Sequence, residues 1–165
     1  MFVAAKHHTF ERFAQAIDDA FARWDRAHLH QFELYPDGAD FRTRPQVIGR
    51  PDPDWDDEAV LDIRRTKLSH LRLGQQFVYV FDLGDDWTHL CTVGDQLVDP
   101  FDVVGIWPSD MPGPLPYFGW GDIPDQYGRR FLGDTADHEP VPPNPRSRDL
   151  PPWRPWWGPD HHYPD

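Results

Sequence analysis

The segment FDLGDDWTHL, residues 81–90, places three carboxylates, an indole and an imidazole within eight positions. Carboxylates and imidazoles bind divalent metal ions and act as acids or bases, so this group of side chains can mark a reaction centre or a metal site. The same residues also suit a tight turn, because Asp side chains accept hydrogen bonds from turn N–H groups and Gly tolerates a positive φ. Both interpretations remain open from the residues alone.

A second polar group lies in HLHQFEL, residues 28–34, whose alternation places His28, His30 and Phe32 on one face of a strand. If that face and the later segment enclose a common space, His28, His30 and His89 with Asp82 can bind zinc or another divalent ion. The candidate site residues are His28, His30, Phe32, Tyr79, Asp82, Asp85, Asp86, Trp87 and His89.

Three hypotheses about function follow, and no catalytic residue is assigned. The first is a non-enzymatic binding or interaction module for a protein or small molecule, with no required cofactor. The second is a metal-dependent hydrolase in which His28, His30 and His89 hold the ion and Asp82 or Asp85 serves as ligand or base. The third is an acidic surface that imitates nucleic acid.

Other catalytic patterns fit poorly. Cys91 is the only cysteine, and its place on a strand predicts a buried, unactivated thiol. None of the serines stands in a nucleophile elbow, and the chain lacks a phosphate-binding Gly loop. The net charge of −12 makes direct binding to nucleic acid unfavourable.

Several elements must position these residues. Thr9 as N-cap and apolar residues at three-to-four spacing predict a helix over 9–24. Strands are expected at 28–34 and at 40–43, with a polar loop over 45–58. Thr66 is expected to cap a short helix over 66–73, and AVLDI before it fits either a strand or a helix.

A hairpin is expected around the opening segment, with strands at 76–82 and 87–94 and a turn at 83–86. If Asp82 pairs with Trp87, then Val80, Asp82, Trp87 and His89 share one face. Gly84 is expected to take the positive φ of the turn.

The 165 residues predict one α+β domain: a mostly antiparallel sheet of about four or five strands, with one long and one short helix packed on it. The domain is expected at residues 1–100. Fifteen of the 19 prolines lie from Pro100 onward, so residues 101–165 are expected to be irregular. No segment has the length and apolarity of a membrane span or a signal peptide, which predicts a cytoplasmic protein.

The extension contains Tyr117, Trp120 and Tyr127, which are expected to fill pockets on the domain or to line an aromatic groove. Three indoles near the end, at Trp153, Trp156 and Trp157, would expose a large apolar area in water. We therefore expect them to dock on this chain or on a second copy, which allows a homodimer through the extension.

The pair of segments WDRAHLHQFEL and FVYVFDLGDDWTHL resembles the plasmid Ri open-reading-frame-three-like family, also known as insertion-element passenger proteins. The resemblance covers about residues 9–95 and departs from the family pattern at Phe81, where Tyr is usual, and at Leu83, where Phe is usual. It implies an α+β fold and no known activity. The residues that match the family signature are His28, His30, Phe32, Tyr79, Asp82, Gly84, Asp85, Trp87 and His89.

Overall fold

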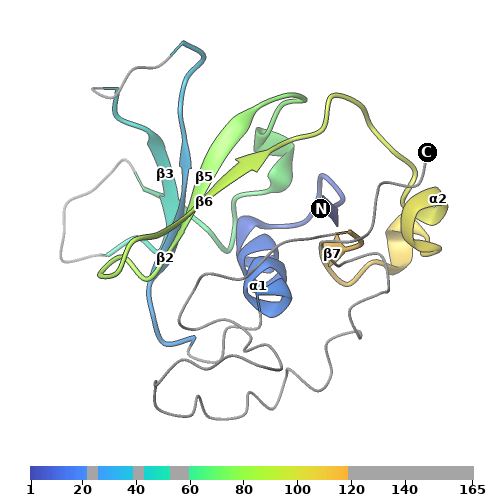
Figure 1. Cartoon of the computed structure of the whole chain (residues 1–165), viewed down its shortest axis with the longest axis horizontal. Helices are drawn as coiled ribbons and strands as arrows, with labels where there is room; N and C mark the ends of the chain where they lie inside the picture. The colour runs from blue at the N-terminus through green and yellow to red at the C-terminus, as the bar shows by residue number, and fades with distance from the viewer. Residues whose placement is uncertain (22–25, 39–42, 53–59, 119–165) are drawn as a thin grey trace, which may run out of the picture.

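A computed structural model describes residues 1–21, 26–38, 43–52 and 60–118, and it shows an α+β fold built on a five-stranded sheet (Figure 1). The strands lie in the order β4-β3-β2-β5-β6, and every neighbouring pair is antiparallel except β3 and β4. Their bounds are β2 His30–Leu34, β3 Gln46–Gly49, β4 Leu61–Asp62, β5 Gln76–Phe81 and β6 Trp87–Thr92. The expected fold class and the mostly antiparallel sheet are confirmed.

The long helix α1 spans Phe10–Ala20 and packs on one face of this sheet. Thr9 caps it as expected, since its hydroxyl accepts a hydrogen bond from the Arg12 N–H at 3.3 Å. The ring of Phe10 lies 5.0 Å from that of Phe32. The helix ends at Ala20, earlier than expected, and residues 22–25 lie outside the described ranges.

The β5–β6 hairpin is present, but its expected register is wrong by one residue. Phe81, and not Asp82, pairs with Trp87, so five residues and not four form the turn. The positive φ expected at Gly84 is found instead at Asp82 and Asp86, with φ of 56° and 58°. Because side chains alternate along a strand, the shift moves Trp87, His89 and Cys91 onto the face that also bears Phe77 and Tyr79.

Two further expectations are corrected. Strand β2 pairs with β5 on one side and with β3 on the other, and β3 lies in the stretch predicted to be a polar loop. The expected strand at 40–43 falls largely on residues outside the described ranges. The helix expected over 66–73 is a single 3₁₀ turn, Leu68–His70, because the Thr66 hydroxyl donates to the Asp62 carbonyl at 2.8 Å and does not cap a helix. The ambiguous AVLDI contains β4.

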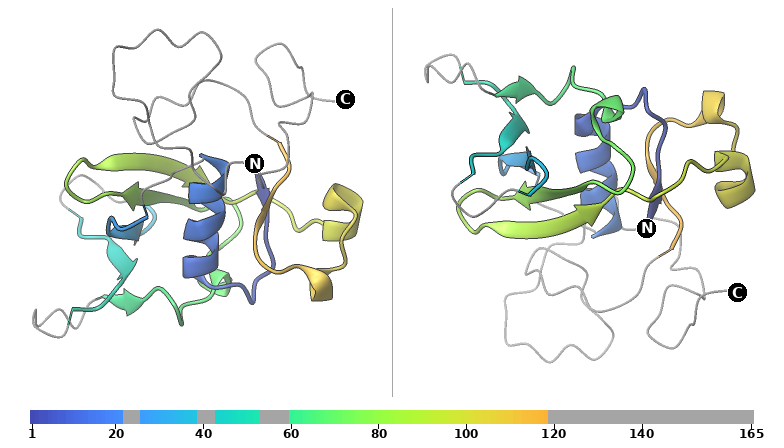
Figure 2. Two further views of the ribbon diagram at one scale, coloured as in Figure 1. Left: turned by 90° about the horizontal axis from the view of Figure 1, so that it is seen from below. Right: turned by 90° about the horizontal axis from the view of Figure 1, so that it is seen from above.

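Part of the extension is regular, contrary to expectation. Residues Pro100–Val104 form α2, Pro108–Asp110 form a second 3₁₀ turn, and β7, Leu115–Pro116, pairs with β1, Phe2–Val3. The two-stranded ribbon lies beside α1, and α2 lies beyond the ribbon, at the end of the molecule away from the β5–β6 turn (Figure 2). In the described ranges, the helices are too short and too polar to cross a membrane.

Candidate functional site

The signature residues at the hairpin turn form a polar clasp. The Asp82 carboxylate lies 2.9 Å from His28 Nδ1 through one oxygen, and its other oxygen accepts from the N–H groups of Gly84 and Asp85 at 3.0 and 3.4 Å. Asp82 is 8% exposed, and its left-handed φ is tolerated because Asp can bond its own turn. The carboxyl expected to be a metal ligand or base is therefore the acceptor that shapes this turn.

Asp85 contributes its backbone N–H to this group of contacts, and Asp86 contributes to the turn itself. Both side chains are exposed on the turn, and the Asp86 carboxylate accepts from the Thr88 hydroxyl at 3.1 Å. The Asp86 N–H donates to the Asp82 carbonyl at 2.7 Å, which closes the turn.

Deeper under α1, the other signature residues form a row across the sheet. The Tyr79 ring lies between His30 and His89, with ring centroids 5.9 and 5.6 Å away, and its hydroxyl donates to Asp18 of α1 at 2.9 Å. Tyr79 and Asp18 are 0% and 4% exposed. This hydrogen bond links α1 to β5, and it compensates both groups for the water that they lose on burial.

Burial lowers the pKa of His30 below its usual value, and the nearby Asp18 carboxylate offsets part of this effect. A neutral imidazole suits a site between a tyrosine ring and a helix. His30 is thus a packing residue of the row.

The expected metal ligands are not brought together. His28 pairs with Asp82 at the turn, whereas Tyr79 separates His30 from His89. In the part of the chain that the structure describes, no group of three or more His, Cys, Asp or Glu side chains is arranged to hold a metal ion. The metal-dependent hydrolase lacks a ligand set there.

A cavity of about 750 Å³ lies beside the row, between α1, β6 and the β1–β7 ribbon. Its helix wall carries Phe13, Ile17 and Phe21, and its sheet wall carries His89 and Cys91. The His89 ring packs edge-on against Phe21 at 4.9 Å, and its Nδ1 lies 3.0 Å from the Trp87 carbonyl. The third wall comes from the ribbon, including Phe2, and from Phe118 just after β7. The volume falls in the range of ligand pockets, and the lining is mainly apolar.

The mouth of the cavity is apolar as well. Leu73, Leu90 and Leu97 border it and are 51%, 69% and 68% exposed. Grouped exposed apolar side chains of this kind mark interaction surfaces more often than isolated ones do.

Strand β6 also presents an open edge at this mouth. The Val93 N–H donates to the Gln75 carbonyl at 2.9 Å, so the odd-numbered residues of β6 direct their backbone groups toward β5. The N–H and C=O groups of Thr88, Leu90 and Thr92 therefore point away from the sheet. Within the described ranges, no hydrogen bond reaches these outward groups. An extended chain can pair with such an edge.

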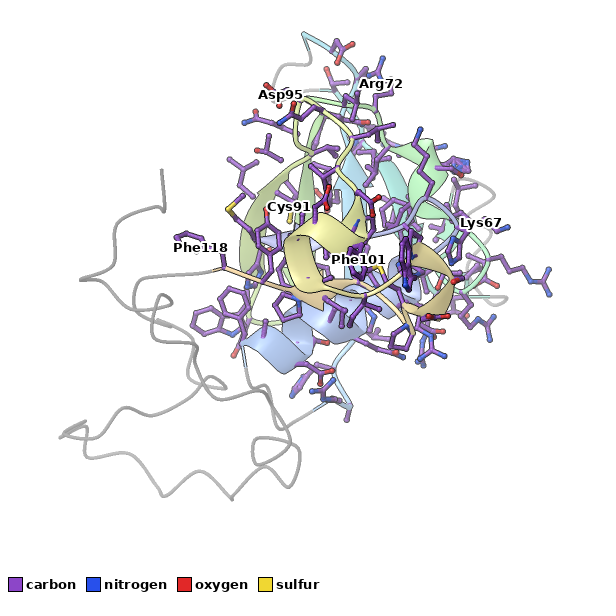
Figure 3. All side chains as sticks on the ribbon, turned by 90° about the vertical axis from the view of Figure 1, so that its right-hand side faces the viewer. Lys67, Arg72, Cys91, Asp95, Phe101 and Phe118 are labelled. Atoms are coloured by element: carbon purple, nitrogen blue, oxygen red, sulfur yellow. The ribbon has the colours of Figure 1, made fainter. Side chains whose placement is uncertain are left out.

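Two side chains of β6, Cys91 and Trp87, were singled out in the sequence, the first as a buried thiol and the second as a candidate binding residue. Burial raises the pKa of the Cys91 thiol to about 12, which agrees with the prediction of an unactivated cysteine. Cys91 lies on the cavity wall and is labelled in Figure 3. The Trp87 indole Nε1 is buried with no hydrogen-bond partner among the described residues. Its role is packing against the core.

Most residues that line the cavity were not predicted as site residues, and Phe21, Cys91 and Phe118 are examples. Phe21 was signalled only by the apolar stripe of α1, and Phe118 only as one of the aromatic residues of the later segment. Tyr117 and Phe118 line the cavity as the expected aromatic segment would, whereas the predicted Trp120, Tyr127 and the terminal tryptophans lie outside the described ranges.

Fold and site together define an α+β domain with an apolar cavity beside an open strand edge. The chain belongs to the family of plasmid pRiA4b ORF-3-like proteins, whose model matches residues 2–106. Among solved structures, it is similar to a protein of unknown function from Methanosarcina mazei Go1, at 20% identity and a TM-score of 0.41. That match covers 59% of this chain and 54% of the other, so the chain spans about half of that protein. A search of curated proteins finds no match.

Proposed function

We propose that the protein is a non-enzymatic binding module, and that its site is the cavity between α1, β6 and the β1–β7 ribbon. The observation that carries the proposal is the coincidence of an apolar cavity of about 750 Å³ with an open strand edge at its mouth. Of the signature residues, His89 reaches the cavity, while His28, His30, Tyr79 and Asp82 hold the wall in place.

An extended peptide segment is the ligand class that fits both features. A strand added beside β6 would pair with the outward backbone groups of Leu90. Its alternate side chains would then fall on the α1 face of the sheet, where Cys91 and Phe21 line the cavity. Backbone pairing would supply part of the affinity, and the apolar cavity would select the side chains.

Selection of random linear peptides on the full-length protein tests this proposal. Enriched sequences should carry apolar residues at alternate positions, and their affinities can be measured by fluorescence anisotropy of the labelled synthetic peptides. Cys91→Phe should weaken binding strongly, because the ring enters the cavity. Thr88→Phe is the matched control, since Thr88 is exposed on the opposite face of β6 and does not line the cavity.

The backbone contribution is tested separately at Leu90. Leu90→Pro removes one outward N–H and leaves the β5–β6 ladder intact, so it should weaken binding about 2- to 10-fold, whereas Leu90→Ser keeps the N–H. Equal affinities of Cys91→Phe and Thr88→Phe, with both variants folded by circular dichroism, would contradict the cavity as the site. Failure to enrich any peptide would contradict the module itself.

A further inference from the structure

We infer that the segment which pairs with β6 is basic at both ends: about ten residues of extended chain with an apolar centre and a Lys or Arg near each end. This inference rests on the proposed function, because it names the chemical class of the partner at the same strand edge. It predicts an affinity that falls as salt is added, because salt screens attraction between exposed charges.

Strand β6 has an uncharged centre and a carboxylate at each end. Residues 87–94 contain no Asp, Glu, Lys or Arg. Asp85 and Asp86 precede this stretch and Asp95 follows it, and all three side chains are exposed. A chain laid along β6 therefore meets apolar surface in the middle and negative charge at either end.

The charge around this edge is of one sign over a long stretch of sequence. Residues 73–118 contain seven aspartates and neither Lys nor Arg. Arg72, the last arginine before this stretch, already pairs with Asp37 at 3.1 Å. Because complementary charges on two surfaces favour their association and like charges oppose it, a basic segment is the partner that suits this edge.

The pairing pattern gives the positions of the basic residues. The backbone groups of Leu90 point outward, so the partner residue opposite Leu90 can serve as the centre of the paired segment. Cross-strand neighbours share a face, so the partner residues opposite His89 and Cys91 face the cavity. Asp86 lies four positions before Leu90, and Asp95 lies five positions after it. We therefore expect the basic residues about four or five positions from the centre of the partner.

A second copy of this chain suits the edge poorly. If two β6 strands paired antiparallel across a two-fold axis at Leu90, Asp85 of one copy would lie opposite Asp95 of the other. Like charges at opposed positions destabilise a strand pair. The net charge of −12 on each chain adds to this repulsion.

The two charged ends should act independently of each other. The strand between them, Trp87–Thr92, has six residues and is about 17–20 Å long, roughly twice the Debye length of about 8 Å at physiological salt. Neutralising one aspartate should therefore affect only the basic residue at that end of the partner. An antiparallel partner places its N-terminal basic residue at Asp95, and a parallel partner places it at Asp86, so the two variants also report the strand direction.

Peptide selection on the full-length protein, carried out at about 0.05 M and at about 0.5 M salt, tests the inference. The low-salt selection should enrich peptides with a basic residue on both sides of an apolar centre, and these peptides should bind less tightly at the higher salt. Asp86→Asn and Asp95→Asn should each weaken their binding about 2- to 5-fold in fluorescence anisotropy, as expected for one exposed ion pair. The double variant should show the product of the two losses.

Asp110→Asn is the matched control, because it removes the same charge from an exposed aspartate on the 3₁₀ turn Pro108–Asp110, which does not line the cavity. Asn suits position 86, since it tolerates a left-handed φ and can still accept from the Thr88 hydroxyl. A peptide whose basic residues are replaced by Gln should bind the wild type and the double variant equally. If Asp86→Asn disturbs the turn in circular dichroism, Asp95→Asn and the Gln peptide decide.

The outcomes separate this inference from the proposed function. Selected peptides without basic ends, bound equally by the wild type and both Asn variants, would overturn the inference and leave the function standing. An equal loss in Asp110→Asn would also overturn it, because the effect would then come from net charge. Basic peptides that weaken in Asp95→Asn but bind Cys91→Phe as tightly as wild type would support the basic partner and contradict the cavity.

Two further results concern the occupant itself. A peptide that dissociates a dimer of this protein in analytical ultracentrifugation would identify a second copy on the edge and overturn the inference. If no peptide binds at either salt concentration, both the inference and the proposed function are wrong.

Discussion

Replacing Tyr79 with Phe removes the hydroxyl that joins β5 to α1. The lost hydrogen bond is 2.9 Å long and connects two residues that are 0% and 4% exposed. A hydrogen bond to a charged group contributes about 1.5–3 kcal/mol, and its loss leaves the buried Asp18 carboxylate with one donor fewer. We therefore expect the free energy of unfolding to fall by about 1.5–3 kcal/mol. The melting temperature should fall by roughly 2–4 °C for each kcal/mol that is lost.

The same chemical change at Tyr35 serves as the matched control. Its hydroxyl also donates to a carboxylate at 2.9 Å, that of Glu33, but both side chains are only partly buried. Solvent can replace this bond, so Tyr35→Phe should cost less than about 1 kcal/mol. Urea unfolding followed by circular dichroism measures both variants. If both variants lost the same free energy of unfolding, burial would not strengthen the Tyr79–Asp18 bond. Our account of how this bond holds α1 as a cavity wall would then be wrong.

The remaining predictions concern the turn and the buried histidines. Asp82→Ala should destabilise the protein by about 2–4 kcal/mol in urea unfolding, because it removes the acceptor for two turn N–H groups and for His28 and leaves a left-handed φ to Ala. Asp86→Gly should be neutral or stabilising by up to about 1 kcal/mol in the same assay, since glycine adopts the φ of 58° without strain. Burial lowers the pKa of His30 and of His8, so below about pH 6.5 the unfolded chain binds these protons first. Stability should accordingly fall as the pH drops through this region, and His30→Gln should flatten the decline measured by urea unfolding from about pH 8 to pH 5; an equally steep decline would contradict the assignment.

The local elements with strong periodicity could be predicted from the sequence. Helix α1 follows from the Thr9 cap and from apolar residues that return every three or four positions, and both signals act within one or two turns. The strand around Phe32 follows from alternation in the same way. The core face of each element was therefore readable before its partners were known.

The register of the hairpin could not be predicted, because it depends on which turn residues leave the right-handed region. Gly84 is the residue expected to adopt a positive φ, yet Asp82 and Asp86 adopt it. The energetic reason lies outside the turn: Asp82 gains His28 as a partner, and its side chain bonds two backbone N–H groups. A contact from the segment that precedes β2 thus accompanies the observed turn, and the faces of Trp87 and His89 differ from the expected ones with it.

The cavity depends on an even more distant contact. Its third wall exists because Phe2 pairs with Pro116 and Val3 with Leu115, and each of these strands has only two residues. Strands this short carry no usable alternation pattern, so neither could be recognised alone. The aromatic content of the later segment was visible, but the position it takes was not.

The contacts of the signature residues explain why their types suggested a metal centre, although the described residues form no such group. His28 with Asp82, and Tyr79 with Asp18, are joined by directional bonds between elements, and such bonds require partly or fully buried polar groups at fixed positions. Binding at an apolar cavity requires the opposite: hydrophobic side chains on the cavity wall, as Cys91 provides, and outward backbone groups on a strand edge, as Leu90 provides. Under the proposed function, the polar motif supports the walls of the site, and the ligand is expected to contact the less distinctive residues beside it.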